Sequence, residues 1–347
     1  MMNPFPIDLY SDTKTRPTPG MRRAMAEAEV GDEQHQEDPT VSRLLERVAE
    51  LLGHEAAVFV PSGTMANAVA VLVHCRAGDE IIAHEASHVI NYEAGAPAAL
   101  AGAMVRAIPG EHGLFDCATV RAAIRPGNRY DLPKSRLIVV EQTANLGGGT
   151  VWPIEQMTDV VTLARQHGLA THLDGARLMN ASTQSGLAPS RYAQIFDTAY
   201  LDFTKGLGAP FGAVLAGTRE MVERAWHWKQ RLGGSMRQAG VLAAACLYAL
   251  DNHVERLMVD HDNARLLAAR LGEITGIAVE AVHTNMVFID VAGTGLTAAE
   301  FNERLRPHGI RTSAQGPTRL RAVTHLDIRR GDVETCAAAF RSIAERR

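Results

Sequence analysis

The sequence LATHLDGARL at residues 169–178 and the sequence TAYLDFTKGLGAP at residues 198–210 decide the expected fold. Each begins with a short apolar run typical of a buried strand and then turns through glycine beside a charged residue, Asp174 in the first and Lys205 in the second. In an open α/β sheet, ligands bind beyond the carboxyl ends of the strands. One strand–helix–strand step separates the two segments, so we predict that Asp174 and Lys205 lie beside each other at one edge of a sheet.

Further apolar runs predict the rest of this sheet. They alternate with helical patterns and lack the alternation of apolar and polar residues that marks a half-exposed strand. These features indicate a mostly parallel sheet covered by helices on both faces. One helix is predicted over residues 40–52, with Asp38 and Pro39 as its start and Gly53 as its stop. The strands are AAVFV (56–60), EIIA (80–83), MVRAI (104–108), RLIVVE (136–141) and FGAVLAG (211–217), and two further helices cover residues 154–166 and 221–231.

The sequence pattern changes near Asp251, where we place a domain boundary. Residues 1–251 would form an N-terminal segment and a large ligand-binding domain, and residues 252–347 a smaller C-terminal α+β domain of ordinary size. A long charged amphipathic helix at residues 253–271 begins the second part, and short strands and a helix at residues 298–305 follow it. No long linker separates the two parts, so we expect a continuous helix to join them.

The composition excludes several classes of protein. The 347 residues include 35 Lys and Arg against 39 Asp and Glu, a net charge of −4, which lacks the basic excess that nucleic-acid binding requires. The chain has no apolar run of about 18 residues and no apolar signal core at its start, so we expect no membrane role. Its four cysteines form no CxxC pair, which favours a cytoplasmic location.

A third group of residues extends the predicted site. Ser62, Gly63 and Thr64 follow another strand and open a helix, where free backbone N–H groups and the helix dipole favour a phosphate. Pyridoxal phosphate uses a lysine for its aldehyde, an acid for its ring nitrogen and an anion site for its phosphate. Lys205, Asp174 and the start of this helix therefore predict a pyridoxal phosphate site, whereas each motif alone is more often a turn or a solvated loop.

The chain resembles the threonine aldolase and β-eliminating lyase family through nearly its whole length. Several short motifs in one order carry the resemblance, and together they are more specific than any one of them. The motifs are SDTKTRPTPGMRRAM (11–25), EDPTV (37–41), FVPSGTMAN (59–67), HLDGARL (172–178), TKGLGAP (204–210), GSMRQAG (234–240) and VTHLD (323–327). The resemblance implies an α/β fold of the pyridoxal-phosphate-dependent transferase type, called fold type I, with a large mixed, mostly parallel sheet domain and a smaller C-terminal α+β domain.

The resemblance also implies roles around the cofactor. Lys205 would carry it covalently, Asp174 would hold its pyridinium nitrogen and Arg177 its phenolic oxygen, and His88 would stack on the ring. Its phosphate would bind at Ser62, Gly63 and Thr64, with Arg237 reaching it from a neighbouring subunit. Such shared sites imply a homo-oligomer, either a dimer or a homotetramer built from catalytic dimers.

For the substrate, the resemblance implies a carboxylate site made by Ser11 and Arg321, with Arg177 beside it. The family reaction cleaves a β-hydroxy-α-amino acid, such as L-threonine or L-allo-threonine, to glycine and an aldehyde. A β-eliminating lyase, an aminotransferase or a racemase would use the same lysine and aspartate, and a cofactor bound only for regulation is a further alternative.

The chain departs from the family pattern at three places. Ala144, in EQTANLGGG, stands where related aldolases have a histidine near the β-hydroxyl, and His35 and Gln36 stand where Tyr-Gly is usual. We hypothesise that His35, presented by the neighbouring subunit, or a water takes over the proton transfer, since imidazole titrates near neutral pH. The alternative is a pocket reshaped for another aldehyde. A lysine usual before the MRQ motif is shifted, with Lys229 beside Gln230, so phosphate anchoring would rest more on Arg237.

The sequence HEASH at residues 84–88 matches the HExxH pattern of zinc hydrolases. That pattern requires one helix through both histidines, but here it follows the strand EIIA directly. We therefore predict no metal site. His172, inside a strand before Asp174, is expected to be a packed core residue.

Overall fold

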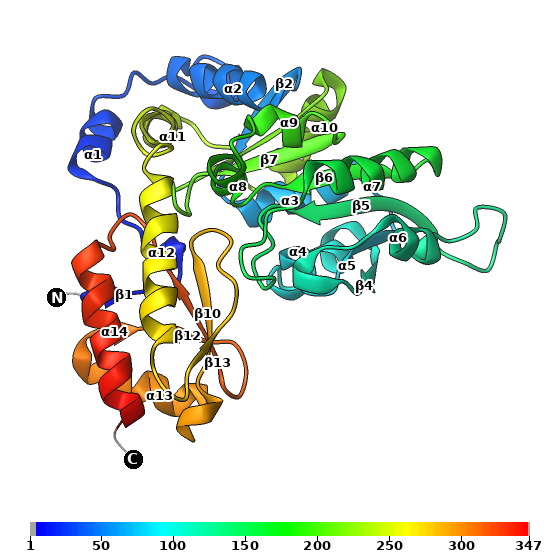
Figure 1. The fold of residues 1–347 in the computed structure, drawn as a ribbon. Coiled ribbons are helices and arrows are strands. Elements are labelled where there is room, and N and C mark those ends of the chain that lie inside the picture. The colour runs from blue at the N-terminus through cyan, green and yellow to red at the C-terminus, as the bar shows by residue number, and fades with distance from the viewer. Residues whose placement is uncertain (1–4, 346–347) are drawn as a thin grey trace.

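The computed structural model describes residues 5–345, and its larger part is built on a seven-stranded sheet (Figure 1). The strand order is β2-β8-β7-β6-β5-β3-β4. All neighbouring pairs from β7 to β4 are parallel, whereas β8 is antiparallel to both β2 and β7. The strands are β2 (Ala56–Val60), β3 (Asp79–His84), β4 (Met104–Ile108), β5 (Lys134–Glu141), β6 (Ala170–Asp174), β7 (Thr198–Asp202) and β8 (Ala213–Gly217). The predicted mixed, mostly parallel sheet is confirmed.

Helices cover both faces of this sheet. Because successive strand residues point to opposite faces, they pack in different hydrophobic clusters. One cluster joins strand residues such as Phe59 and Leu201 to α2, α7, α8, α9 and α11. The opposite face packs Val58 and Tyr200 against α3 and α10. The helices are α1 (Pro19–Ala26), α2 (Pro39–Leu52), α3 (Gly63–His74), α4 (His88–Asn91), α5 (Ala96–Ala101), α6 (Cys117–Ala123), α7 (Ile154–Gln166), α8 (Leu178–Ser185), α9 (Pro189–Ala193), α10 (Arg219–Arg231) and α11 (Gly240–Asn252), with 3-10 turns η1 (Asp12–Lys14), η2 (Glu33–His35) and η3 (Glu111–Gly113).

The smaller part contains a four-stranded antiparallel sheet of order β12-β13-β10-β9. A separate short pair, β1 with β11, brings the N-terminal segment onto this part, and Ile7 and Leu9 join its hydrophobic core. The elements are β1 (Ile7–Asp8), α12 (Leu257–Gly272), β9 (Ala278–Val279), β10 (Met286–Asp290), η4 (Ala292–Thr294), α13 (Ala298–Leu305), η5 (Arg306–His308), β11 (Ile310–Arg311), β12 (Ser313–Ala314), β13 (Arg319–Val323) and α14 (Arg330–Glu345). Residues 5–9 therefore bridge back to the C-terminal elements.

Helix α2 begins and ends as the sequence predicts. The Asp38 side chain accepts hydrogen bonds from the amides of Thr40 and Val41 at 3.1 and 3.0 Å, which caps the helix start. At the other end, Gly53 adopts a left-handed φ of 72°, which glycine reaches at little cost.

The predicted continuous helix between the two parts is wrong. Helix α11 ends at Asn252, residues 253–256 form a turn, and α12 begins at Leu257. The Nδ1 atom of His253 lies 2.7 Å from the carbonyl oxygen of Leu207, which ties this turn to the loop after Lys205.

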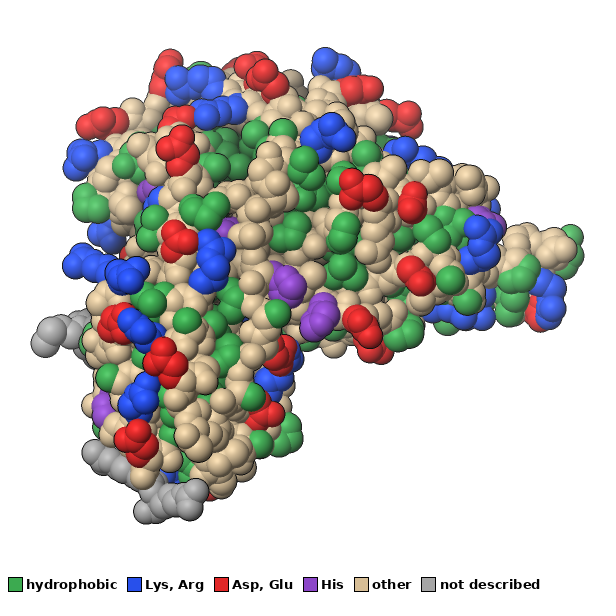
Figure 2. Space-filling model, viewed as in Figure 1, with side chains coloured by type: hydrophobic (Ala, Val, Ile, Leu, Met, Phe, Trp, Pro, Cys, Tyr) green, Lys and Arg blue, Asp and Glu red, His purple; other side chains and the backbone are tan. Residues whose placement is uncertain are grey.

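The surface agrees with the balanced composition. Figure 2 shows Lys and Arg side chains mixed with Asp and Glu over the visible face, without a patch of one sign on that face. Within residues 5–345, no helix is long and apolar enough to cross a membrane.

Candidate active site

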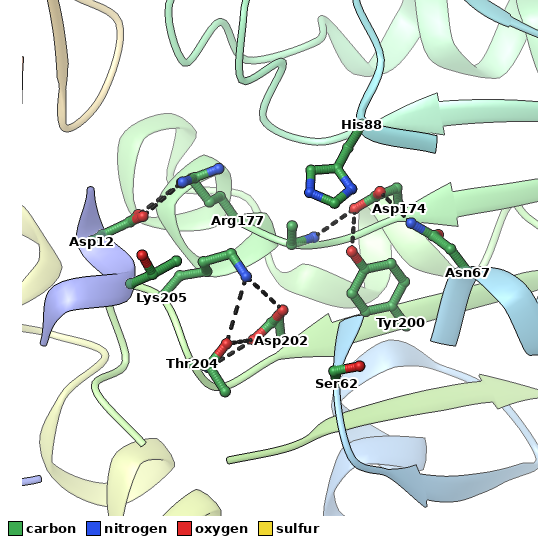
Figure 3. A network of polar contacts seen from close by, with 12 residues as sticks. Asp12, Ser62, Asn67, His88, Asp174, Arg177, Tyr200, Asp202, Thr204 and Lys205 are labelled. Carbon is green, nitrogen blue, oxygen red and sulfur yellow. Dashed lines mark hydrogen bonds and ion pairs between the residues drawn. The ribbon is translucent and has the colours of Figure 1, made fainter. Parts of the chain in front are cut away.

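Three carboxylates end three neighbouring parallel strands of the large sheet. Glu141 ends β5, Asp174 ends β6 and Asp202 ends β7, and Lys205 follows three residues after Asp202. Strand β5 pairs in parallel with β6, and β6 with β7, so the carboxyl ends lie at one edge. Figure 3 shows Asp174 and Lys205 in the same site, as the sequence predicts.

Asp174 is buried and held by three donors. Its Oδ2 accepts from Asn67 Nδ2 at 2.8 Å, and its Oδ1 accepts from Tyr200 Oη at 2.5 Å and from the Ala176 amide at 3.1 Å. Burial, together with the negative charges of Asp174 and Asp202, raises the pKa of Tyr200 well above its usual range, so its hydroxyl stays a donor. The carboxylate is therefore fixed in orientation before any ligand binds.

His172 supports this arrangement from behind, beyond the packing role that the sequence suggests. Its ring lies 3.0 Å from Asn67 Oδ1 and 2.8 Å from Thr198 Oγ1. Burial lowers the pKa of His172 to about 3, so the imidazole is neutral. The histidine orients the amide of Asn67, whose Nδ2 then donates to Asp174. Asn67 stands inside the quoted motif FVPSGTMAN, although the sequence gives no sign that it faces Asp174.

His88 lies beside Asp174 within a group of acids (Figure 3). Its Nδ1 is 2.9 Å from Glu93 Oε1, and its amide donates to Glu141 Oε2 at 2.6 Å. Burial opposes the charged form of His88, but Glu93, Asp174 and Glu141 together raise its pKa. Burial, and then the charge of Asp174, raises the pKa of Glu141 to about 7.

Lys205 is a partly exposed amine with a buried acidic partner. Its Nζ lies 2.9 Å from Asp202 Oδ2 and 3.5 Å from Thr204 Oγ1. The other Asp202 oxygen accepts from the amide and the hydroxyl of Thr204, both at 2.7 Å. The Lys205 side chain is 19% exposed and that of Asp202 only 1%, so the amine faces the site while the carboxylate is enclosed.

The start of α3 lies directly beside this pair. Ser62 Oγ accepts from the Met65 amide at 3.2 Å, and the amides of Gly63 and Thr64 are among the first in the helix, which have no intrahelical acceptor. A Cβ on Gly63 would lie 2.6 Å from Asp202 Oδ2 and 3.1 Å from Tyr200 Oη, so only glycine fits here. The start of α3, which can bind an anion, thus lies together with Lys205 and the fixed carboxylate of Asp174, and this combination fits pyridoxal phosphate.

Arg177 is held by an acid that the sequence analysis does not single out. Its Nε and Nη2 donate to the two oxygens of Asp12 at 2.7 and 2.6 Å, and Asn285 Nδ2 lies 3.2 Å from the same carboxylate. Although burial opposes ionisation, Arg177 holds the pKa of Asp12 far below its usual range. Asp12 follows Ser11 directly and so brings the N-terminal segment to the site.

Arg321 presents a buried donor near the same segment. Its Nη1 donates to Asn145 Oδ1 at 2.8 Å and its Nη2 to the Tyr10 carbonyl at 3.3 Å. Its Nε is buried and finds no hydrogen-bond partner among the described residues, which leaves a donor for an anionic ligand. Ser11, next to Tyr10, is buried and caps η1 by accepting from the Thr13 amide at 3.2 Å.

Comparison with known proteins agrees with this geometry. The family described as β-eliminating lyase matches residues 8–294. Low-specificity L-threonine aldolase 1 of Arabidopsis thaliana is 41% identical over 340 residues, covering 96% of this chain and 95% of that protein. Low specificity L-threonine aldolase of Escherichia coli K12 is 40% identical over 341 residues, covering 98% of this chain and all of that protein. The chain belongs to the β-eliminating lyase family.

Solved structures agree on the fold. A threonine aldolase structure from Leishmania major superposes with a TM-score of 0.84 at 21% identity, covering 97% of this chain and 99% of that one. The structure of a protein from Listeria monocytogenes named a putative L-allo-threonine aldolase gives a TM-score of 0.80 at 19% identity, covering 98% of this chain and 96% of that one. The predicted family and fold are confirmed.

Arg237, assigned through the family resemblance, and His35, proposed at a departure from the family pattern, both lie on exposed segments of the described chain. Arg237 is 58% exposed and its Nη1 lies 2.7 Å from Asp32 Oδ2. His35 is exposed at the end of η2, one residue before Gln36, which adopts a left-handed φ of 60°. Their roles in a shared site remain predictions that need a second subunit.

The other departures from the family pattern also have a structural setting. Ala144 is buried, and its amide donates to the Thr150 carbonyl at 3.0 Å. The Cβ of Ala144 packs closely on Gly113, where an added Cβ would lie 2.5 Å from it. Lys229 is fully buried in an ion pair with Glu33 and so faces the interior. In the HEASH segment, His84 ends β3 and His88 begins α4, so one helix does not carry both histidines.

Proposed function

We propose that this member of the family is a pyridoxal-phosphate-dependent aldolase. It cleaves L-threonine, L-allo-threonine or a related β-hydroxy-α-amino acid to glycine and an aldehyde. The observation that carries the proposal is the meeting of Lys205, Asp174 and the start of α3 at one sheet edge, in a chain about 40% identical to low-specificity L-threonine aldolases over nearly its full length.

Each part of the site suits one part of the cofactor. Lys205 would bind the aldehyde carbon, Asp174 the ring nitrogen, and Ser62, Gly63 and Thr64 the phosphate. His88 would lie against the ring and Arg177 would bind the ring oxygen. The bound cofactor supplies a ring that accepts the electron pair left when a bond to Cα breaks. The fixed carboxylate of Asp174 favours the protonated ring nitrogen that this requires.

Binding of the substrate carboxylate would select which bond breaks. The Nε donor of Arg321, to which no other described residue is hydrogen-bonded, would fix the carboxylate together with Ser11 and Arg177. This would orient the Cα–Cβ bond perpendicular to the ring. Orientation of this kind contributes several kcal/mol to catalysis. Cleavage also requires removal of the β-hydroxyl proton, and we assign this to His35 of a neighbouring subunit or to a water, because Ala144 carries no titratable group.

An oligomer with shared sites would explain why Arg237 and His35 lie on exposed segments. Both flank the same region: Arg237 pairs with Asp32, and Asp32 caps the η2 turn that ends at His35. A groove of about 900 Å³ between α2, β2 and α10 opens beside η2 and offers room for contact with another chain. We propose a homodimer or a homotetramer of such dimers, in the cytoplasm, where the four unpaired cysteines would remain reduced.

The test is a substrate panel with the purified, cofactor-loaded protein. L-Threonine, L-allo-threonine and L-serine are supplied separately, and glycine, acetaldehyde, pyruvate and 2-oxobutyrate are measured. Glycine with acetaldehyde from either threonine isomer supports the aldolase. Pyruvate or 2-oxobutyrate would instead indicate the β-eliminating lyase that the family description suggests, and keto-acid-dependent exchange of amino groups would indicate an aminotransferase.

The same experiment includes Lys205→Ala and borohydride reduction. Reduction of the loaded wild-type protein is expected to fix the cofactor on the peptide that contains Lys205, and Lys205→Ala is expected to lose both the adduct and the cleavage. A colourless protein, or an adduct on another side chain, would refute the assignment.

A further inference from the structure

Asp202 lies between the proposed cofactor lysine, Lys205, and the proposed phosphate-binding site at Gly63 and Thr64. Its Oδ2 lies 2.9 Å from Lys205 Nζ, and the same oxygen is the atom nearest to a Cβ built on Gly63. The side chain is 1% exposed, and Figure 3 shows the ion pair together with the two hydrogen bonds from Thr204. Neither the sequence motifs nor the proposed reaction uses this carboxylate.

This arrangement is typical of a binding site for an ammonium group. A carboxylate enclosed this well costs free energy unless a cation or hydrogen-bond donors satisfy it. Thr204 donates two hydrogen bonds to Oδ1 of Asp202. The other oxygen, Oδ2, accepts from Lys205, whose ammonium group supplies the positive charge that balances the carboxylate. Asp12 and Arg177 also act electrostatically on this pair, Asp12 on Lys205 and Arg177 on Asp202, but their hydrogen bonds join them to each other. Lys205 is therefore the ion-pair partner of Asp202.

We propose that Asp202 is a positioning residue that holds the ammonium group of Lys205 whenever this amine is not bonded to the cofactor. The inference rests on the proposed function, which requires Lys205 to leave the cofactor once in every turnover. In that exchange, the substrate nitrogen would replace Nζ on the cofactor carbon, and the three protons of the substrate ammonium group would pass to Nζ, which would leave as an ammonium group. Asp202 then holds the resulting ammonium group away from the bond to be cleaved.

The position of Asp202 adds a second consequence. An anion bound at the amides of Gly63 and Thr64 would lie close to the carboxylate, and two like charges at short distance repel. An ammonium group on Lys205 would offset this repulsion, so the free lysine and the bound phosphate can be held at the same time. Substitution of Asp202 by asparagine should weaken the hold on the free lysine without weakening cofactor binding.

Lysine labelling tests the proposal directly, because the chain has only four lysines and they form matched controls. Lys14 and Lys134 are exposed, Lys229 is buried with Glu33, and Lys205 is held by Asp202. The cofactor-free, full-length wild type and Asp202→Asn are treated briefly with an acetylating N-hydroxysuccinimide ester, and each lysine peptide is quantified by mass spectrometry. The amine of Lys205 is held in a hydrogen-bonded ion pair, and Asp202→Asn removes its charged partner. We therefore expect acetylation of Lys205 to rise at least about threefold in this variant relative to Lys14 and Lys134.

An equal rate of Lys205 acetylation in the two proteins would overturn the proposal. Lys229 is buried, so its acetylation reports unfolding. If acetylation of Lys229 rises in Asp202→Asn, Thr204→Val is used as the test variant instead. That variant removes the hydroxyl that orients Asp202, and a smaller increase at Lys205 is expected with Lys229 still protected. No increase in this folded variant would equally overturn the proposal.

A second measurement uses the cofactor-loaded protein. Glycine is titrated while the cofactor absorbance is followed, and the concentration for half the spectral change is expected to rise several-fold in Asp202→Asn, because the displaced lysine loses its partner. The dissociation constant of the cofactor itself should not increase. A purely structural role would weaken cofactor binding and glycine binding alike, and an unchanged glycine titration contradicts the proposal. The proposed function fails separately, through the borohydride experiment, if Lys205 does not carry the cofactor.

Discussion

Glu33 and Lys229 form an ion pair in which neither side chain is more than 1% exposed. The second oxygen of Glu33 accepts from the Met236 amide at 3.0 Å, and Lys229 Nζ lies 4.2 Å from the centre of the Trp226 ring. Burial lowers the pKa of Lys229, an effect that Glu33 opposes. The pair joins the turn before His35 to the segment before Arg237, the two exposed segments assigned here to a shared site.

Removal of one member of this pair should be costly. Glu33→Ala leaves a buried ammonium group without a partner, and we expect the free energy of unfolding to fall by about 3–5 kcal/mol. Urea denaturation followed by circular dichroism measures the change. Glu50→Ala, at an exposed position of α2, is the control and should stay within about 0.5 kcal/mol of wild type. A loss below about 1 kcal/mol in Glu33→Ala would show that the pair contributes little.

The carboxylate of Asp174 should matter more for the reaction than for folding. Asp174→Asn keeps the shape of the side chain but removes the negative charge that balances a protonated ring nitrogen, so kcat should fall by about 10²-fold or more. Tyr200→Phe removes one of the three donors and should lower kcat only by about 2–10-fold. Both are measured by aldehyde release at saturating L-threonine, with the bound cofactor quantified. Equal rates for Asp174→Asn and wild type would contradict the assigned role.

Glu141 predicts a pH dependence of stability with a definite sign. Burial and the neighbouring Asp174 raise its pKa from the ordinary 4.5 to about 7 in the folded protein. Between these two pH values the unfolded chain ionises Glu141 while the folded protein keeps it protonated. Stability is therefore lost as the pH rises, and the loss levels off above pH 7.

The comparison of wild type with Glu141→Gln isolates this effect. Between pH 4.5 and pH 7, the unfolding free energy of Glu141→Gln should rise relative to that of wild type by on the order of 1–3 kcal/mol. Urea titrations at half-unit pH steps measure it, and Glu50→Gln on the surface serves as the control. A difference that stays constant over this range, or that favours wild type as the pH rises, would contradict the prediction.

The sequence predicts those parts of the site that depend on strand ends and helix starts. Asp174 and Lys205 follow apolar runs that the pattern predicts as neighbouring strands, and the order of βαβ units then brings the strand ends together. Ser62, Gly63 and Thr64 open α3 for a local reason, namely the cap that Ser62 supplies. Local pattern and connection rules suffice for these residues.

The supporting contacts could not be predicted, because they join residues far apart along the chain. Asp12 reaches Arg177 across 165 positions, and Asn67 reaches Asp174 across 107. Each acid or amide also has an ordinary interpretation as a turn or core residue, so one sequence gives no reason to choose these pairs. The packing of Ile7 in the smaller core has the same cause, since β1 pairs with β11 near the other end.

His35 is tested by substitution and by mixing of subunits. If it removes the β-hydroxyl proton, His35→Ala should lower kcat for L-threonine and phenylserine by about 10²-fold or more, while glycine still changes the cofactor spectrum. Mixing His35→Ala with Lys205→Ala should restore part of the activity, because a hybrid dimer contains one site with an intact lysine from one chain and His35 from the other. Unchanged cleavage in His35→Ala would assign the proton transfer to a water or to another group.

Arg321 should act on substrate binding rather than on the cofactor. Its Nε, which has no hydrogen-bond partner within residues 5–345, is the donor that we assign to the substrate carboxylate, and the side chain is also held by Asn145. Arg321→Lys keeps a positive charge but loses the planar fork, and one lost hydrogen bond between charged groups corresponds to about a 10–100-fold rise in KM. The dissociation constant of pyridoxal phosphate should change little, since Lys205, Asp174 and the start of α3 are untouched. Kinetics with L-threonine and titration of the cofactor-free protein with pyridoxal phosphate separate the two effects, and a loss of cofactor affinity with KM unchanged would move Arg321 from the substrate to the cofactor.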